Sequence, residues 1–296
     1  MDLMDEDWRV VFESRHLAPC KDRALVLAAA NIPHQVIRDV GGCVLIVPAE
    51  WSSEAVEELN LYEDENPPVA IAPPPRIVYQ DAMPGIFAFT VIVALIAWAD
   101  AVNFFGMDWR SAGRVDGELI RGGEVWRLAT ALTLHSGASH LAGNLVFGCF
   151  FGFFAGRLLG SGVAWGAIVL AAMFGNLVNI LLLDSDFKSI GASTAVFAAL
   201  GMLAGYVWRA RLMSQERWPY RWGPVVGGLA LLMFTGTGDE NTDIGAHLMG
   251  FLAGFGAGVL LTRWRERLLS PRLQLLGGAV GIGMIVLAWS WAISSL

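Results

Sequence analysis

Residues 244–262 have the sequence IGAHLMGFLAGFGAGVLLT, a run of 19 residues that contains no acidic, lysine or arginine side chain. About 20 mainly apolar residues in a helix are enough to cross the hydrocarbon core of a bilayer. Gly250, Gly254 and Gly258 follow one another at four-residue spacing, which places them on one helix face where another backbone can approach closely. The run therefore predicts a membrane-spanning helix that packs tightly against a neighbour.

Further charge-poor runs flank this one on both sides. The chain of 296 residues is 55% hydrophobic and only 16% charged, whereas a soluble globular protein has roughly 25% charged residues. This composition excludes a disordered chain and disfavours an ordinary soluble enzyme. We predict an all-helical polytopic membrane domain at residues 86–296 with seven spans, the second and fifth being the shortest. The predicted spans are 86–105, 140–156, 158–183, 189–208, 222–238, 244–262 and 273–296.

The first part of the chain has a different composition. Residues 1–80 hold 6 basic and 14 acidic side chains, whereas residues 81–296 hold 14 basic and 13 acidic side chains. We expect residues 1–66 to form a small soluble acidic α/β domain with a two-residue hairpin turn at Gly41 and Gly42. Its expected elements are a strand at 8–16, a helix at 21–31, strands at 34–40 and 43–47 and a helix at 51–61.

A proline-rich segment separates the two regions. Five of the 12 prolines lie between residues 67 and 75, and such a segment builds neither a helix nor a central strand. We therefore predict a linker at residues 67–85.

The basic residues of the short loops predict the orientation. With the N-terminus in the cytoplasm, ten arginines lie on the cytoplasmic side and five basic residues lie outside. We therefore expect a bacterial inner (plasma) membrane protein with a cytoplasmic N-terminus and an extracytoplasmic C-terminus. The sequence does not open on an apolar segment, so we expect no cleaved secretory signal. The cytoplasmic set is Arg76, Arg157, Arg209, Arg211, Arg217, Arg221, Arg263, Arg265, Arg267 and Arg272, and the outer set is Arg110, Arg114, Arg121, Arg127 and Lys188.

Several classes of ligand are disfavoured. The chain has no surplus of basic residues, which disfavours binding to nucleic acid. The three cysteines, Cys20, Cys43 and Cys149, lack metal-ligand spacing, so we expect them to be free thiols. The histidines form no HExxH pair and no carboxylate lies near them within a span, so a metal site is disfavoured and we expect no cofactor. Transport is disfavoured because neither a repeat nor a buried charge is evident.

Four polar side chains enter the predicted spans, where polar groups are costly and point to function. They are His140, Asn144, Ser193 and His247, all near the starts of spans that run inward from the outer face. Counting about 1.5 Å per residue from the outer charged residues, Ser193 lies roughly 7 Å and His247 roughly 6 Å deep. Close packing of the fourth span on the sixth would bring these two within hydrogen-bonding range.

This constellation predicts nucleophilic acyl transfer. A neutral imidazole on His247 can remove the proton that makes the Ser193 hydroxyl a weak nucleophile. His140 and Asn144 share a helix face at i, i+4 and, with the Ser193 backbone N–H, could donate to an oxyanion. Taken singly, each residue has a simpler explanation: the serine could cap a helix, and the asparagine could join two helices.

With these residues assembled, the chain resembles the rhomboid family of intramembrane serine proteases over most of residues 86–292. Together the motifs are highly specific, although a lone GxS would carry almost no weight. The matching motifs, in the family's order, are Gly123-Glu124-Val125-Trp126-Arg127, His135-x4-His140-x3-Asn144, Gly191-x-Ser193 and Ala246-His247-x2-Gly250-x3-Gly254.

The resemblance implies a Ser193–His247 dyad without a third acid, so Asp243 is not assigned to a triad. It implies a site that opens to the extracytoplasmic side and cleaves the transmembrane segments of other membrane proteins within the lipid bilayer. Phe197 is expected to pack against the base, and Gly191 to keep the site open. Trp126 and Arg127 are expected to anchor the first loop, and a seventh helix is a known family variant.

One departure is Thr194, where the family usually has glycine; a β-branched residue there could narrow the site. The alternative function is a catalytically inactive rhomboid-like protein that binds and guides membrane helices. Such a protein is expected to lack the serine or the histidine, and this chain has both.

Overall fold

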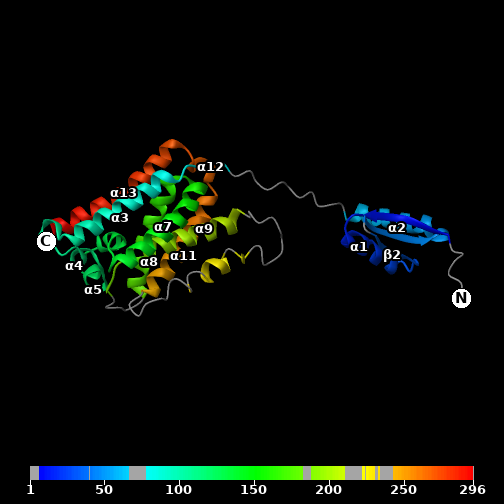
Figure 1. The fold of residues 1–296 in the computed structure, drawn as a ribbon, viewed down its shortest axis with the longest axis horizontal. Helices are drawn as coiled ribbons and strands as arrows, with labels where there is room; N and C mark the ends of the chain where they lie inside the picture. Colours follow the sequence, from blue (N-terminus) through cyan, green and yellow to red (C-terminus); the bar gives the residue numbers. More distant parts are fainter. Residues whose placement is uncertain are drawn as a thin grey trace. The chain divides into compact units, whose positions relative to one another are not determined.

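The computed structural model describes residues 7–39, 41–66, 78–182, 188–210, 222–223, 225–230, 233 and 243–295. The chain divides into two compact units, Met1–Pro73 and Pro74–Leu296 (Figure 1). Of the predicted span at 222–238, the structure describes residues 222–223, 225–230 and 233, all of them helical, and the remaining eight lie outside the described residues.

The N-terminal unit is a three-stranded antiparallel sheet with two helices. The strands lie in the order β1-β3-β2. Asp39 pairs with Gly42, so Gly42 belongs to β3 and the expected turn at Gly41 and Gly42 is one residue too late. The elements are β1 (Trp8–Ser14), α1 (Leu17–Ala29), β2 (Gln35–Asp39), β3 (Gly42–Pro48) and α2 (Ser52–Glu65).

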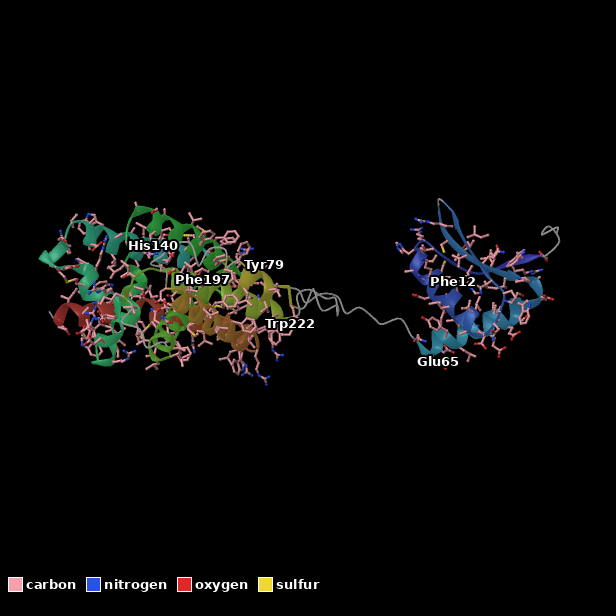
Figure 2. All side chains as sticks on the ribbon, turned by 90° about the horizontal axis from the view of Figure 1, so that it is seen from below. Phe12, Glu65, Tyr79, His140, Phe197 and Trp222 are labelled. Atoms are coloured by element: carbon pink, nitrogen blue, oxygen red, sulfur yellow. The ribbon has the colours of Figure 1, made fainter. Side chains whose placement is uncertain are left out.

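This unit has a hydrophobic core of its own. Leu27, Leu45 and Val47 are fully buried between the sheet and the helices. The Cys20 thiol donates to the Cys43 carbonyl at 3.2 Å, and burial raises the pKa of Cys20 to about 11. Both cysteines are free, so in this unit they act as small apolar side chains. Figure 2 shows Phe12 on the same unit.

The second unit is a bundle of long helices. Five of the described helices are long and apolar enough to cross a membrane, namely α3, α7, α8, α11 and α13. The predicted fourth span is the helix α9, whose 18 residues include 12 that are buried; it lies in the middle of the bundle. The bounds are α3 (Met83–Ala101), α7 (Ala138–Leu159), α8 (Ser161–Leu182), α9 (Ser193–Ala210), α11 (Ile244–Thr262) and α13 (Pro271–Ser294).

The first span is displaced relative to the prediction. It ends at Ala101 and not at residue 105, because Asn103 and Phe105 adopt φ angles of 46° and 64°, which an α-helix does not accommodate. Asp100, near the helix end, forms an ion pair with Arg110 at 2.8 Å. The charged residue therefore marks the end of the span.

Glycines bring α9 and α11 into close contact, as their spacing predicts. A Cβ added at Gly201 would overlap the backbone of Phe251, and one added at Gly254 would overlap the backbone of Ala198. Gly258 meets α9 backbone in the same way one turn further on. Every side chain larger than hydrogen at these positions would push the two helices apart.

The segment between α3 and α7 contains short elements that the sequence patterns do not reveal. β4 and β5 pair Val115 with Ser189, which ties this loop to the chain just before α9. The short elements of the segment include α4 (Trp109–Gly113), β4 (Val115–Asp116), α5 (Gly117–Arg121) and α6 (Arg127–Thr130), and the partner strand β5 (Lys188–Ser189) lies between α8 and α9.

The last helix, α13, packs along α8. The Gln274 side-chain oxygen accepts hydrogen bonds from the Gly162 and Val163 N–H groups at 3.0 and 3.2 Å. Near the other end, the Trp289 indole donates to Thr133 Oγ1 at 3.0 Å. α13 therefore caps the start of α8 and supports the chain that leads into α7.

We predict that Gly254→Val lowers the free energy of unfolding by about 3 kcal/mol, because overpacking forces two backbones apart. The matched control is Gly256→Val on the same helix, where an added Cβ meets nothing within 4 Å. Thermal unfolding of both purified variants in detergent measures the difference. Equal stability of the two variants would contradict the close packing of α9 on α11.

Candidate active site

Ser193 and His247 lie at the starts of two packed helices. Ser193 is the first residue of α9 and His247 lies in the first turn of α11. His247 Nε2 and Ser193 Oγ are 2.7 Å apart, a normal hydrogen-bond distance. The depth estimate from the sequence had placed the two side chains at similar levels, and the structure brings them together.

The His247 ring is enclosed. Only 6% of its surface is exposed, and its ring centroid lies 4.5 Å from that of Phe197, one turn after Ser193 on α9. Figure 2 shows Phe197 within the helical unit. Phe197 therefore occupies the packing position against the imidazole that the family resemblance implies.

Gly191 is required by both its backbone conformation and its surroundings. Its φ of 145° is one that residues with a side chain rarely adopt. A Cβ there would lie 2.8 Å from the His140 ring and 3.4 Å from Ser193 Oγ. The absence of a side chain therefore lets the imidazole of His140 approach the serine.

His140 and Asn144 share a face of α7 at the same cavity. His140 Nδ1 lies 3.0 Å from Ser136 Oγ, so the ring is held from its outer side. Asn144 is 6% exposed, and its amide donates to the His140 carbonyl at 3.0 Å. One amide hydrogen of Asn144 is thus used within its own helix, and the second remains available to a group in the cavity.

All four polar residues line one cavity of about 490 Å³. Gly191, Thr194 and Phe197 line it as well. The cavity is thus enclosed by the starts of α7, α9 and α11, which the sequence analysis placed at the outer face of the membrane.

Thr194 packs toward α11. It is 5% exposed, and a Cβ added at Gly250 would lie 2.6 Å from the Thr194 carbonyl and 2.9 Å from its methyl group. Gly250 therefore provides the space that the threonine occupies. This contact explains how a β-branched residue fits beside the serine.

Asp243 is the centre of a hydrogen-bond network that no pattern in the sequence reveals. Its carboxylate caps α11 by accepting from the Ala246 N–H at 2.9 Å. The same carboxylate accepts from the Asn179 amide at 3.0 and 3.1 Å and from Ser189 Oγ at 3.1 Å. These bonds fix the first turn of α11, and with it His247, to α8 and β5. The signal in the sequence for the helix cap is an aspartate just before the predicted span.

Trp126 and Arg127 lie in the loop before α7 and do not line the cavity. The Arg127 guanidinium is ion-paired with Glu124 at 2.6 Å and donates to the Ser111 and Arg114 carbonyls at 2.8 and 3.1 Å. The Trp126 ring centroid lies 5.2 Å from that of Trp291 on α13. Arg127 thus holds distant parts of the first loop together, and Trp126 connects this loop to α13.

His135 supports the backbone beside the serine. It is 5% exposed, and its Nε2 accepts from the Ala192 N–H at 3.4 Å. Burial, together with the nearby His140, lowers the pKa of His135 to about 4. His135 is therefore neutral near pH 7, as this hydrogen bond requires.

Comparisons with known proteins bear on the family of the membrane region. Residues 122–264 match the family model of the Rhomboid domain. Rhomboid-like protease 1 of Toxoplasma gondii is 32% identical over 148 residues, 49% of this chain and 50% of that protein. The putative rhomboid protease YdcA of Bacillus subtilis is 26% identical over 175 residues, which are 59% of this chain and 80% of that protein. Rhomboid protease GluP of Bacillus subtilis is 31% identical over 175 residues, which are 57% of this chain and 33% of that protein.

The fold defines an integral membrane protein whose bundle holds a serine and a histidine in hydrogen-bond contact. The match of residues 122–264 to the Rhomboid domain and the rhomboid proteases among the relatives support the rhomboid family for this membrane region. The alignment spans about half the length of the Toxoplasma relative.

We predict that His135 makes the protein acid-sensitive. Its pKa is about 4 in the folded protein and about 6.5 in an unfolded chain, so between these values the unfolded chain binds more protons. Stability is therefore highest above pH 6.5 and falls by roughly 3 kcal/mol as the pH drops to about 4. Thermal unfolding across this range should show a flatter profile for His135→Gln. Identical pH profiles would contradict the assignment.

Proposed function

We propose that the protein is an intramembrane serine endopeptidase that cleaves transmembrane segments of other membrane proteins through a Ser193–His247 dyad. The observation that carries the proposal is the 2.7 Å contact between His247 Nε2 and Ser193 Oγ, in a cavity within the bundle. The rhomboid proteases among the relatives support the same reaction class.

The chemistry follows from this contact. Ser193 Oγ attacks the carbonyl carbon of the peptide bond while its proton moves to His247 Nε2. His247 then gives this proton to the leaving amine, and the acyl group stays on the serine. Water next attacks the ester, with His247 again acting as base, and the serine is regenerated. No cofactor or metal takes part in these steps.

The oxyanion that forms in each step needs hydrogen-bond donors. The N–H of Ser193 has no acceptor within its own helix, because it belongs to the first turn of α9. The amide of Asn144 and the ring of His140 line the same cavity. We assign these three groups to the oxyanion site. Each donor of this kind typically raises the turnover rate by a factor of about 10² to 10³.

The wider organisation is part of the same proposal. Residues 1–66 form a soluble cytoplasmic domain, 67–85 a linker and 86–296 a seven-span membrane domain. The arginine distribution supports an active site that opens to the extracytoplasmic side of a bacterial inner membrane. The partners are transmembrane protein substrates and the surrounding lipid.

The alternative function is a catalytically inactive rhomboid-like protein that binds and guides membrane helices. Both functions require a membrane bundle with a cavity, but only the protease requires a nucleophilic serine. Labelling by a serine-reactive fluorophosphonate therefore separates them without knowledge of the natural substrate.

We predict that wild-type protein in detergent is labelled by a fluorophosphonate on Ser193, and that Ser193→Ala and His247→Ala lose labelling to background. Loss of the nucleophile or of its base is expected to lower turnover by on the order of 10⁴-fold or more. In-gel fluorescence and mass spectrometry of the labelled peptide measure the reaction, and a panel of single-span membrane proteins tests cleavage.

The matched control is Ser290→Ala, which removes an exposed serine of α13 outside the cavity and should leave labelling unchanged. Folding of every variant is checked by thermal unfolding. Absence of labelling in well-folded wild-type protein favours the non-catalytic alternative, and cleavage undiminished in Ser193→Ala would falsify the dyad.

We predict that Asn144→Ala lowers the rate constant of fluorophosphonate labelling and of cleavage by about 10²-fold, because it removes an oxyanion donor. Its hydrogen bond to the His140 carbonyl lies within one helix, so the midpoint of thermal unfolding should change little. A clear loss of stability with an unchanged rate constant would assign Asn144 to helix packing.

A further inference from the structure

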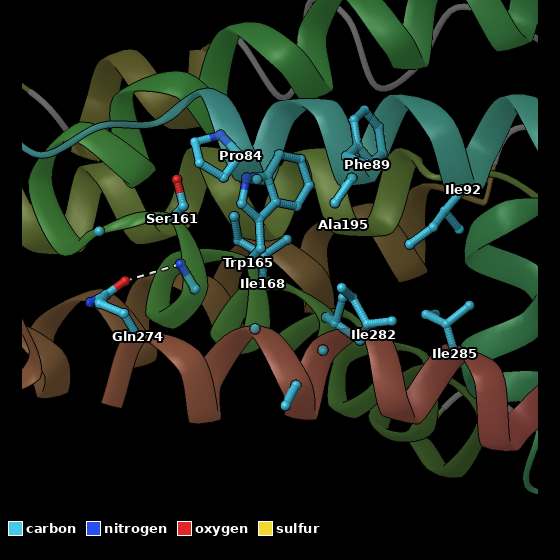
Figure 3. Close-up of a pocket in the computed structure, with 18 of the residues that line it drawn as sticks. Pro84, Phe89, Ile92, Ser161, Trp165, Ile168, Ala195, Gln274, Ile282 and Ile285 are labelled. Atoms are coloured by element: carbon cyan, nitrogen blue, oxygen red, sulfur yellow. Dashed lines mark hydrogen bonds between the residues drawn. The ribbon is translucent and has the colours of Figure 1, made fainter. Parts of the chain in front are cut away.

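A second cavity, of about 590 Å³, lies between α3, α8 and α13. Figure 3 shows α3 and α13 on opposite sides of it, with Trp165 and Ile168 of α8 between them. Its walls are formed by apolar side chains such as Phe89, Ile92 and Ile282. None of the residues assigned to catalysis lines it.

The wall along α13 runs from Leu275 to Ile285, a length of about 15 Å at the rise of an α-helix. Leu275 is 77% exposed and Ile282 is 46% exposed, so the cavity is a groove with an open side. Because these helices are apolar and long enough to span a membrane, the open side faces the acyl chains of the bilayer.

All but one of the polar side chains that line the groove gather at one end; the exception, Thr133, lies near the other end, where its hydroxyl accepts from the Trp289 indole. Gln80, Asp81, Ser161 and Gln274 make up the polar end, close to the first residues of α3, α8 and α13. Their place at the helix ends sets them at the headgroup level, whereas the apolar walls extend into the hydrocarbon region. The groove thus has the polarity profile of a lipid, with a polar head and an apolar tail.

Positive charge surrounds this end. Arg272 is exposed and lies three residues before Leu275, on the same face of α13 as the groove. Arg157 donates to the Gln80 carbonyl, and Arg265 donates to the Leu158 carbonyl. Asp81 is the carboxylate among the lining residues, and it accepts from the Met83 N–H at 2.9 Å. Three arginines against one aspartate favour an anionic headgroup.

A transmembrane helix of another protein is the other apolar occupant that a bilayer offers. With its side chains a helix is about 10 Å across, far wider than a single acyl chain. Water is disfavoured as well, because the apolar walls give it few hydrogen-bond partners. A single acyl chain is thin, flexible and already present on the open side.

We propose that the groove between α3 and α13 binds one acyl chain of an anionic phospholipid, whose phosphate is held by Arg272. This inference depends on the fold and is independent of the proposed protease activity. The lipid fills the space between two helices that both pack on α8, and it is thereby a structural component of the bundle.

The test is titration of the purified full-length protein, in an uncharged detergent, with phosphatidylglycerol and with phosphatidylcholine of the same chains. Native mass spectrometry gives the dissociation constant, and thermal unfolding gives the stabilisation. Ala279→Phe adds an aromatic ring to a lining position and should weaken binding of phosphatidylglycerol at least tenfold. Val280→Phe, next to it but outside the lining, should bind as the wild type does.

Arg272→Gln should weaken the binding of phosphatidylglycerol about tenfold and leave the binding of phosphatidylcholine unchanged. The control is Arg267→Gln, which replaces an exposed arginine shortly before α13 and should change the binding of neither lipid. Unchanged affinity of Ala279→Phe overturns the acyl-chain site, and equal binding of both lipids with no effect of Arg272→Gln overturns the headgroup assignment.

A measurement on the wild-type chain covers the case in which Ala279→Phe does not fold. Phosphatidylglycerol with a photoreactive diazirine in its acyl chain should attach to groove residues such as Ile92 and Ile282. Attachment only at positions outside the groove, such as Phe87 and Leu276, refutes the proposal.

Discussion

The contact of α9 with α11 is the constraint on which the rest of the membrane unit depends. Glycines on both helices bring backbone against backbone, so the relative rotation and height of the two helices have little freedom. The bond between Ser193 and His247 lies at one end of this contact. Its length of 2.7 Å is therefore a consequence of helix packing along several turns and not of the two side chains alone.

A second layer of contacts holds the starts of these helices in place. Asp243 joins α11 to α8 and to the strand before α9, and His135 supports the backbone at Ala192. Gly191 leaves room for the His140 ring. Each of these contacts comes from a different segment of the chain, so the cavity has its shape only in the assembled bundle.

The sequence predicts the six long helices described in the bundle because charge-poor runs of bilayer length are a strong signal, although α3 ends four residues earlier than predicted. It predicts the proximity of Ser193 and His247 because both lie at similar depth on glycine-faced helices. It does not predict the short helices between α3 and α7, since Arg127 organises them through carbonyls far apart in the chain. The Asp243 network and the fit of Thr194 against Gly250 are likewise invisible, because they join residues that no periodic pattern relates. The catalytic roles themselves stay proposals.

Gln274 has a consequence for how the protein is made. Its side chain accepts from the first N–H groups of α8 and donates to the Leu159 carbonyl, yet it belongs to the last helix. These backbone groups belong to the last turn of α7 and the first turn of α8, where a helix has no partners of its own to offer them. Gln274 is synthesised 112 residues after Gly162, whose N–H it accepts from, so the start of α8 acquires this hydrogen bond only after that stretch of chain has been made.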